Sequence, residues 1–281
     1  MQKTLKRYFL VFTLPTLVAF ALAFIIPFIM GVYMSFCEFT TVDNAKFVGV
    51  SNYVKAFVGS NSFVSALGFT VKFVIVAILS INILAFALAL VLTKKIRGTN
   101  IFRTIFFMPN LIGGIVLGYT WQQMLNAILL KYQTTLVSNS TYGYWGLVLL
   151  MNWQMIGYMM IIYIAGLQNV PTDLIEAAKI DGATSWQTLI NVTIPMVMPS
   201  ITICTFLTLS NSFKLYDQNL ALTAGAPMHR TEMMALNIVN TFYGKTGFQG
   251  VGQAKAVIFF IIVAAIGAIQ LVFTRNKEVD Q

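Results

Sequence analysis

The chain has 281 residues, of which 58% are hydrophobic and only 10% are charged, and its formal net charge is +9. Soluble domains carry about 25% charged residues, so this composition excludes an ordinary soluble protein and predicts an integral membrane protein. Since the polar gaps between the apolar runs are short, we expect residues 1–281 to form a single transmembrane domain.

Six apolar runs are long enough to cross a bilayer, which takes about 20 helical residues. The runs are continuous, without the alternation that marks the strands of a membrane barrel, so we predict an all-α fold. The predicted spans are Tyr8–Phe36, Phe69–Thr93, Thr104–Leu125, Tyr144–Leu167, Pro199–Leu222 and Ala254–Thr274. The first run exceeds the apolar stretch of about 7–15 residues in a cleavable signal peptide, so we expect it to be retained.

Basic residues predict the orientation, because Lys and Arg accumulate on the cytoplasmic side of a membrane. With the N-terminus inside, the cytoplasmic basic residues are Lys3, Lys6, Arg7, Lys94, Lys95, Arg97, Arg103, Lys179, Arg275 and Lys277, and those outside are Lys46, Lys55, Lys131, Arg230 and Lys245. Lys72 lies near the outer end of the second span, close enough to reach the interface. We therefore expect both termini to be cytoplasmic. The net charge follows from this bias, so no nucleic-acid partner is expected.

No motif for covalent chemistry is visible. Cys37 and Cys204 belong to different spans at different depths, so neither a disulfide nor a metal site is expected. His229 is the only histidine and falls in a predicted outer loop. The segment YGKTG, which begins at Tyr243, is not a phosphate-binding loop, because Val239 stands where the first glycine belongs. We expect no catalytic residue, no metal and no nucleotide on this chain, and no enzyme activity.

The third and fourth spans carry small and polar residues. Gly114 and Gly118, four residues apart, predict close helix packing. The segment MNWQMIGYMM in the fourth span combines amides, such as Asn152, with aromatic rings, including Tyr158, as sugar sites do. Trp145 and Trp153 fit the simpler explanation of packing or an interfacial belt.

The segment from Gln168 to Ser200 is the longest predicted cytoplasmic loop. It is expected to hold a helix that begins at Pro171 and Thr172 and stops at Gly182, in a left-handed cap position, followed by a second helix from Ser185 that stops before Pro195. Apolar and small residues on the first helix are flanked by carboxylates; they are Leu174, Ala177, Ala178 and Ile180, beside Glu176 and Asp181. This pattern favours a protein-docking element over a helix resting on lipid, which would prefer basic residues.

The stretch EAAKIDGATSWQTLINVTIP closely resembles the EAA loop of permease subunits in bacterial ATP-binding-cassette importers. The positions in step are Glu176, Ala177, Ala178, Gly182 and Pro195. The segments FVGVSNY, RTIFFMPNLIGGIV and ALTAGAPMHRTEMM resemble the carbohydrate-uptake branch of that family. Together these segments span most of the chain, from Phe47 to near its end, so the chain resembles a maltose-importer-type permease subunit.

This resemblance implies a type I importer fold with six transmembrane helices and a cytoplasmic coupling helix, in the bacterial inner membrane. It implies four kinds of partner: a second homologous permease, two copies of a cytoplasmic ATPase that bind ATP and Mg, an extracellular solute-binding protein, and a sugar, most simply an oligosaccharide. Glu176 would face basic groups of the ATPase, and Pro195 would set the start of the fifth helix.

The fifth predicted span is polar for a membrane helix, where Lys or Asp at the centre costs about 2.5–3.5 kcal/mol. Two neighbouring faces are expected to line a wet path between subunits: Thr208, Ser212, Leu215 and Asn219 on one, and Asn211, Lys214 and Asp217 or Gln218 on the other. The family resemblance places a sugar site at Tyr158, Thr208, Ser212 and Leu215, although Leu215 departs from the family's amide.

Two questions stay open at this point. Lys214 and Asp217 could pair or could sit at the outer interface, and the interface is slightly favoured. An ion-coupled secondary transporter is the rival function, but it predicts internal repeats and an intramembrane acid, for which the sequence gives little support.

Overall fold

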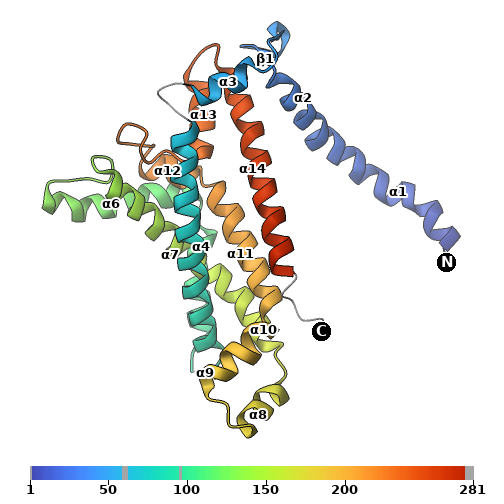
Figure 1. The fold of residues 1–281 in the computed structure, drawn as a ribbon, viewed down its shortest axis with the longest axis vertical. Helices are drawn as coiled ribbons and strands as arrows, with labels where there is room; N and C mark the ends of the chain where they lie inside the picture. Colours follow the sequence, from blue (N-terminus) through green and yellow to red (C-terminus); the bar gives the residue numbers. More distant parts are fainter. Residues whose placement is uncertain (1, 59–62, 95–96, 276–281) are drawn as a thin grey trace. The chain divides into compact units, whose positions relative to one another are not determined.

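The computed structural model describes residues 2–58, 63–94 and 97–275, and nearly all of its regular structure is helical (Figure 1). Two compact units divide the chain, the first comprising residues 1–63 and 238–260, the second residues 64–237 and 261–281. Four helices are long and apolar enough to span a membrane, and two bent helix pairs bring the total to six if each pair is one span. The described residues thus agree with the predicted six-span, all-α fold.

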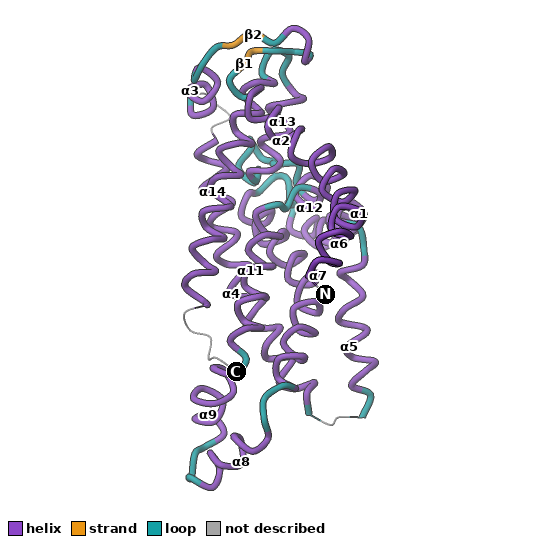
Figure 2. The backbone as a smooth tube through the Cα atoms, turned by 90° about the vertical axis from the view of Figure 1, so that its right-hand side faces the viewer, coloured by secondary structure: helices purple, strands orange, loops and turns teal. Residues whose placement is uncertain are grey.

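The first unit contains the N-terminal span. The helices α1 (Gln2–Phe20) and α2 (Ile26–Met34) are joined by a π-helical turn at Ala21–Ile25, and the strands β1 (Cys37–Glu38) and β2 (Lys46–Phe47) form a small antiparallel pair (Figure 2). The helix α3 (Ser51–Phe57) follows. The amide of Asn52 donates to the carbonyl oxygens of Ser35, at 3.0 Å, and Cys37, at 2.8 Å, so this buried side chain helps to attach α3 to the end of α2.

The second unit holds the remaining polar and apolar features that bear on function. Its helices are α4 (Phe63–Thr93), α5 (Thr99–Phe107), α6 (Gly114–Leu129), α7 (Ser140–Gln168), α8 (Thr172–Ile180), α9 (Ser185–Thr188), α10 (Ile194–Met196), α11 (Met198–Phe213) and α12 (Asp217–Leu222), while α13 (Met234–Gly244) and α14 (Gln249–Arg275) each extend over both units. Its core lies where α4, α7 and α11 pack together, around Ile81, Met159 and Tyr163; Figure 1 shows the three helices.

The third predicted span is broken, contrary to the continuous helix expected over Thr104–Leu125. The helices α5 and α6 meet at an angle of 101°. Between them lie a short 3₁₀ segment, Met108–Leu111, and an extended Gly113. Pro109 lacks a backbone N–H donor, so the regular α-helix ends before it and the chain turns through the 3₁₀ segment.

The fifth span was predicted wrongly at its outer end. We expected helix to Leu222, but α11 ends at Phe213 and a separate helix, α12, begins at Asp217. The interruption falls at Lys214, where a stretch rich in polar residues begins. The side chain of Lys214 is exposed, so this position is not part of the apolar core.

Helical structure also continues through Pro195, where we had expected it to stop. The N–H of Ile194 bonds to the carbonyl of Leu189, five residues back, in a π-helical turn. Because this wider turn precedes it, Pro195 sits in the first turn of α10, where its missing N–H is tolerated. The real break comes at Val197, where α10 and α11 form a bend of 71°.

Candidate functional site

The segment between α7 and α10 folds as the sequence predicted in its first half. The helix α8 begins at Thr172, directly after Pro171, and Asp181 is its C-cap residue. Gly182 follows with φ of 79°, and the N–H of Ala183 bonds to the carbonyl of Ala178 at 2.9 Å. A residue with a side chain is disfavoured in this left-handed conformation, so glycine allows the sharp turn that separates α8 from α9.

A capping box starts the second helix and was not foreseen. The hydroxyl of Thr184 accepts a bond from the Gln187 N–H at 3.3 Å, and the Gln187 side chain accepts one from the Thr184 N–H at 2.8 Å. The T-x-x-Q spacing is legible in the sequence and could have been used to place this start.

The surface of α8 and α9 combines exposed apolar side chains with carboxylates. Ile180 is 85% exposed, Trp186 68% and Leu174 44%, and Glu176 and Asp181 are exposed beside them. Large exposed apolar residues rimmed by charge mark a protein-contact surface. We call these five residues the knob. Trp186 was missed in the sequence analysis, which stopped at the first helix.

The knob is attached to the rest of the unit by its opposite side. Ile175 packs against the core cluster of α4, α7 and α11, and α8 and α9 lie at one end of these helices (Figures 1 and 2). The helix α8 is therefore in direct contact with the core of the second unit. A cavity of about 300 Å³ lies beside the knob, and the basic residues Lys94 and Lys179 are among those that line it.

A line of buried and partly buried polar side chains joins the three central helices. The hydroxyl of Tyr163 on α7 donates to Asn82 Oδ1 on α4 at 2.7 Å, and Asn82 Nδ2 donates to Thr208 Oγ1 on α11 at 3.3 Å. The Thr208 hydroxyl donates in turn to the carbonyl of Cys204 at 2.8 Å. These bonds satisfy polar groups that would otherwise be costly in an apolar interior.

A second polar contact lies along the same helices. Asn152 donates to Ser80 Oγ at 2.9 Å. Among the residues that the structure describes, Asn152 Oδ1 and Ser212 Oγ are buried without a hydrogen-bond partner. Sequence reasoning found Asn152 and Ser212 but missed Asn82 and Ser80, which are single polar residues in an otherwise apolar run and could have been found as such.

The structure separates the six residues predicted to line a path. Thr208, Ser212 and Leu215 are buried within the unit, with 0%, 0% and 3% of their surface exposed. Tyr158 is half-buried against the core, with its ring centroid 6.4 Å from that of Phe107. Only Asn211, on the neighbouring face of α11, is exposed.

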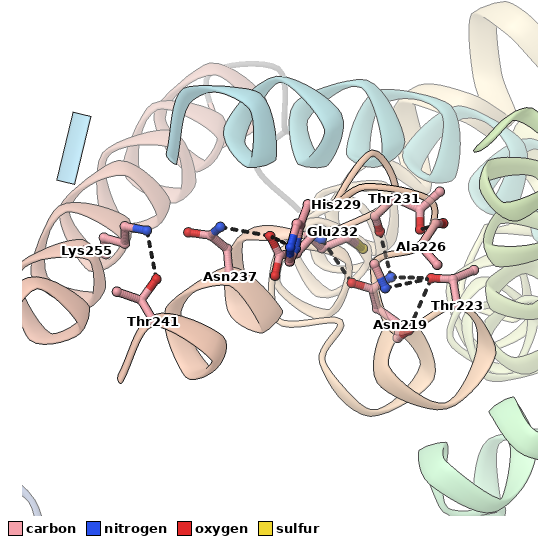
Figure 3. Close-up of polar contacts among 11 residues, drawn as sticks. Asn219, Thr223, Ala226, His229, Thr231, Glu232, Asn237, Thr241 and Lys255 are labelled. Carbon is pink, nitrogen blue, oxygen red and sulfur yellow. Dashed lines mark hydrogen bonds and ion pairs between the residues drawn. The ribbon is translucent and has the colours of Figure 1, made fainter. Parts of the chain in front are cut away.

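The sixth residue, Asn219, organises a loop. Its amide donates to Thr223 Oγ1 at 3.0 Å and to the carbonyl of Thr231 at 2.8 Å, while its oxygen accepts the N–H of Met233 at 2.9 Å (Figure 3). In the same loop, His229 Nδ1 lies 3.2 Å from the carboxylate of Glu232. Every polar atom of the Asn219 side chain is thus engaged inside the chain.

Close helix packing at the predicted glycines is confirmed. A Cβ atom built on Gly114 would lie 2.7 Å from Asp217 Cβ, and one on Gly118 would lie 2.7 Å from Ala221 Cβ, both on α12. The amide of Gln218 on α12 also donates to Gln154 Oε1 on α7 at 2.8 Å. Gln218 is therefore engaged in packing α12 against α7.

Two further expectations concern charge and metals. Lys214 and Asp217 are both exposed, and these two described residues form no ion pair with each other. Of the two alternatives, this excludes the pair and agrees with a position at the outer membrane interface. In the described part of the chain, no group of three or more His, Cys, Asp or Glu side chains is placed to hold a metal ion.

Helices long and apolar enough to cross a membrane, with an exposed helical knob at one end, are the features expected of an integral membrane protein that contacts another protein. The chain belongs to the family of binding-protein-dependent transport system inner membrane components, whose signature matches residues 54–278. This assignment confirms the predicted membrane location and class of function.

Similar proteins agree with this assignment. The chain is 43% identical, over 97% of its length and 96% of the relative's, to a probable starch degradation products transport system permease protein of Thermoanaerobacterium thermosulfurigenes. It is 29% identical, over 99% of both chains, to a multiple sugar-binding transport system permease protein of Streptococcus mutans. Its fold matches that of a bacterial ABC transporter involved in alginate import with a TM-score of 0.83, 18% identity and 98% coverage of each chain.

Proposed function

We propose that this chain is the membrane-spanning permease subunit of an ATP-driven importer of oligosaccharides. The permease relatives named for starch degradation products and for multiple sugars support the substrate class. A solved alginate transporter of the same fold, bound to a pentasaccharide-loaded periplasmic protein, supports delivery by a binding protein. The other half of the translocation path would come from a second, homologous permease.

The exposed knob is the observation that carries the coupling part of the proposal. Its apolar side chains Ile180 and Trp186 face away from the unit, and Glu176 offers a carboxylate for basic groups of a partner. In this proposal, two copies of a cytoplasmic ATPase bind ATP and Mg and hold one knob each. Closure of the ATPases moves α8, and Ile175 passes the movement to the central helices.

The exposed face of α11 is the proposed contribution of this chain to the path. Asn211 lies on that face, and an amide is a suitable partner for sugar hydroxyls. Thr208, Ser212 and Leu215 lie behind it, packed inside the unit, so their role in the proposal is to position the face. Tyr158, half-buried, would reach the substrate only if the central helices separate.

An ion-coupled secondary transporter is not favoured. Such a protein is expected to carry an acidic residue within a span for coupling to the ion. None of the four spans or the two bent pairs contains an Asp or Glu residue. Membership of the binding-protein-dependent family also argues against a transporter that works alone.

Reconstitution tests the function directly. The chain, its partner permease and the ATPase are placed in liposomes, and uptake of a labelled malto-oligosaccharide is measured with and without enclosed ATP and external binding protein. The proposal predicts uptake only when both are present. Uptake by this chain alone, driven by an ion gradient, would contradict it.

A further inference from the structure

A cavity of about 480 Å³ in the second unit lies away from the knob and the polar line, between the first turns of α4 and α7 and the loop that follows α12. Two basic residues line it, Lys72 and Arg230, together with the hydroxyls of Ser140 and Thr141 and the rings of Tyr144 and Trp145. The proposed transport function assigns no role to this cavity.

The charge of the cavity is unbalanced. Lys72 and Arg230 are both exposed, and among the described residues neither has a carboxylate within ion-pair distance. The ammonium group of Lys72 stands 4.7 Å from the ring centroid of Tyr144, and the Tyr144 hydroxyl donates to the Lys72 carbonyl at 3.3 Å. These contacts hold Lys72 at the cavity wall. The N-terminal turn of α7 adds partial positive charge from the helix dipole.

The position of Lys72 along α4 gives the cavity a depth in the bilayer. Lys94, which directly follows α4, is 22 positions after Lys72 in the sequence, and no charged residue lies between them. At a rise of about 1.5 Å per residue this separation is about 33 Å, close to the roughly 30 Å thickness of the hydrocarbon core. If Lys94 marks the cytoplasmic interface, Lys72 lies at the level of the outer headgroups. Trp145, 55% exposed, belongs to the aromatic residues typical of that level.

We propose that this cavity binds the phosphate of an anionic phospholipid headgroup from the outer leaflet, between Lys72 and Arg230. Phosphate oxygens would accept charge-assisted bonds from both side chains. The hydroxyls of Ser140 and Thr141 suit the polar part of a glycerol headgroup, and the exposed ring of Trp145 suits the start of the acyl chains. The ligand is thus a lipid at the rim of the transporter.

The test is a titration of phosphatidylglycerol into the purified full transporter, followed by native mass spectrometry. Wild type is compared with K72Q/R230Q, with the charge-conserving K72R/R230K, and with K131Q, which removes an exposed basic residue outside the cavity. Loss of both charges is expected to weaken binding roughly thirtyfold. K72R/R230K and K131Q should bind as wild type does, and phosphatidylcholine should bind more weakly than phosphatidylglycerol to wild type.

Three results would overturn the assignment. Equal binding of phosphatidylglycerol by wild type and K72Q/R230Q would show that Lys72 and Arg230 do not bind the lipid phosphate. Displacement of the lipid by millimolar inorganic phosphate would make the cavity a site for free anions. Unchanged lipid binding together with loss of the binding protein from K72Q/R230Q would make it a protein-docking surface. If K72Q/R230Q fails to assemble, the test rests on K72R/R230K, which keeps both charges. Loss of phosphatidylglycerol binding by K72R/R230K, while K131Q still binds the lipid, would also contradict the proposal.

Discussion

Asn82 on α4 and Thr208 on α11 are joined by a hydrogen bond of 3.3 Å across 126 residues of sequence. Tyr163 on α7 completes the line through its bond to Asn82, so three helices that cross the membrane meet at one polar point. Hydrogen bonds of this kind between membrane helices contribute about 0.6 kcal/mol on average. The line therefore helps to fix the register of the helices more than it adds to overall stability.

Removing the hydroxyl in Tyr163→Phe is expected to lower the stability of the chain by about 0.5–1.5 kcal/mol, because the partly buried Asn82 Oδ1 loses its hydrogen-bond donor. The measurement is thermal unfolding of the purified chain in detergent. Tyr33→Phe is the control, since Tyr33 is 59% exposed. A Tyr163→Phe chain as stable as the Tyr33→Phe chain would show that the line carries no free energy.

Gly157 on α7 is expected to be intolerant of any side chain. A Cβ atom there would collide with the backbone carbonyl of Phe106 on α5, which cannot move aside as a flexible side chain can. Gly157→Ala should therefore cost about 1–3 kcal/mol through displacement of α5. Gly113→Ala, where nothing lies within 4 Å of the added atom, is the matched control. Equal unfolding temperatures for the two variants would contradict this packing.

The exposed face of α11 is expected to act on transport and the buried face on stability. Asn211→Leu should raise the KM for oligosaccharide uptake about tenfold without changing thermal stability, the loss corresponding to about one hydrogen bond to substrate. Thr208→Val should lower stability instead. Ile203→Ala, an exposed apolar position on the same helix, is the control. Unchanged KM in Asn211→Leu would remove this residue from the path.

The sequence predicted those features that depend on local chemistry or on the length of apolar runs. The left-handed turn at Gly182 and the close packing at Gly114 and Gly118 follow from the absence of a side chain. The exposure of Trp186 could not be predicted from the residues next to it in sequence. It depends on the direction that α9 takes after its cap at Thr184.

Long-range relations were beyond the sequence. The helical spacing of Thr208, Ser212 and Asn219 placed them on one face, but it could not tell which neighbour that face meets. The structure shows that the face of Thr208 and Ser212 is buried inside the unit and that Asn219 ties down a loop. The end of α11 at Phe213 was equally hidden, since an apolar stretch resumes soon after the polar break.

Association of the chain with a cytoplasmic ATPase through the knob is the central claim, and one pull-down tests it most directly. Tagged wild type, Glu176→Lys and Glu38→Lys are solubilised from native membranes, and the copurifying subunits are identified and quantified. Glu38 is an exposed carboxylate outside the knob, so its reversal controls for the change of charge. We expect wild type and Glu38→Lys to bring down an ATPase and a second permease, and Glu176→Lys to lose the ATPase while keeping the permease. Equal recovery of the ATPase in all three, or its absence from wild type, would contradict the account.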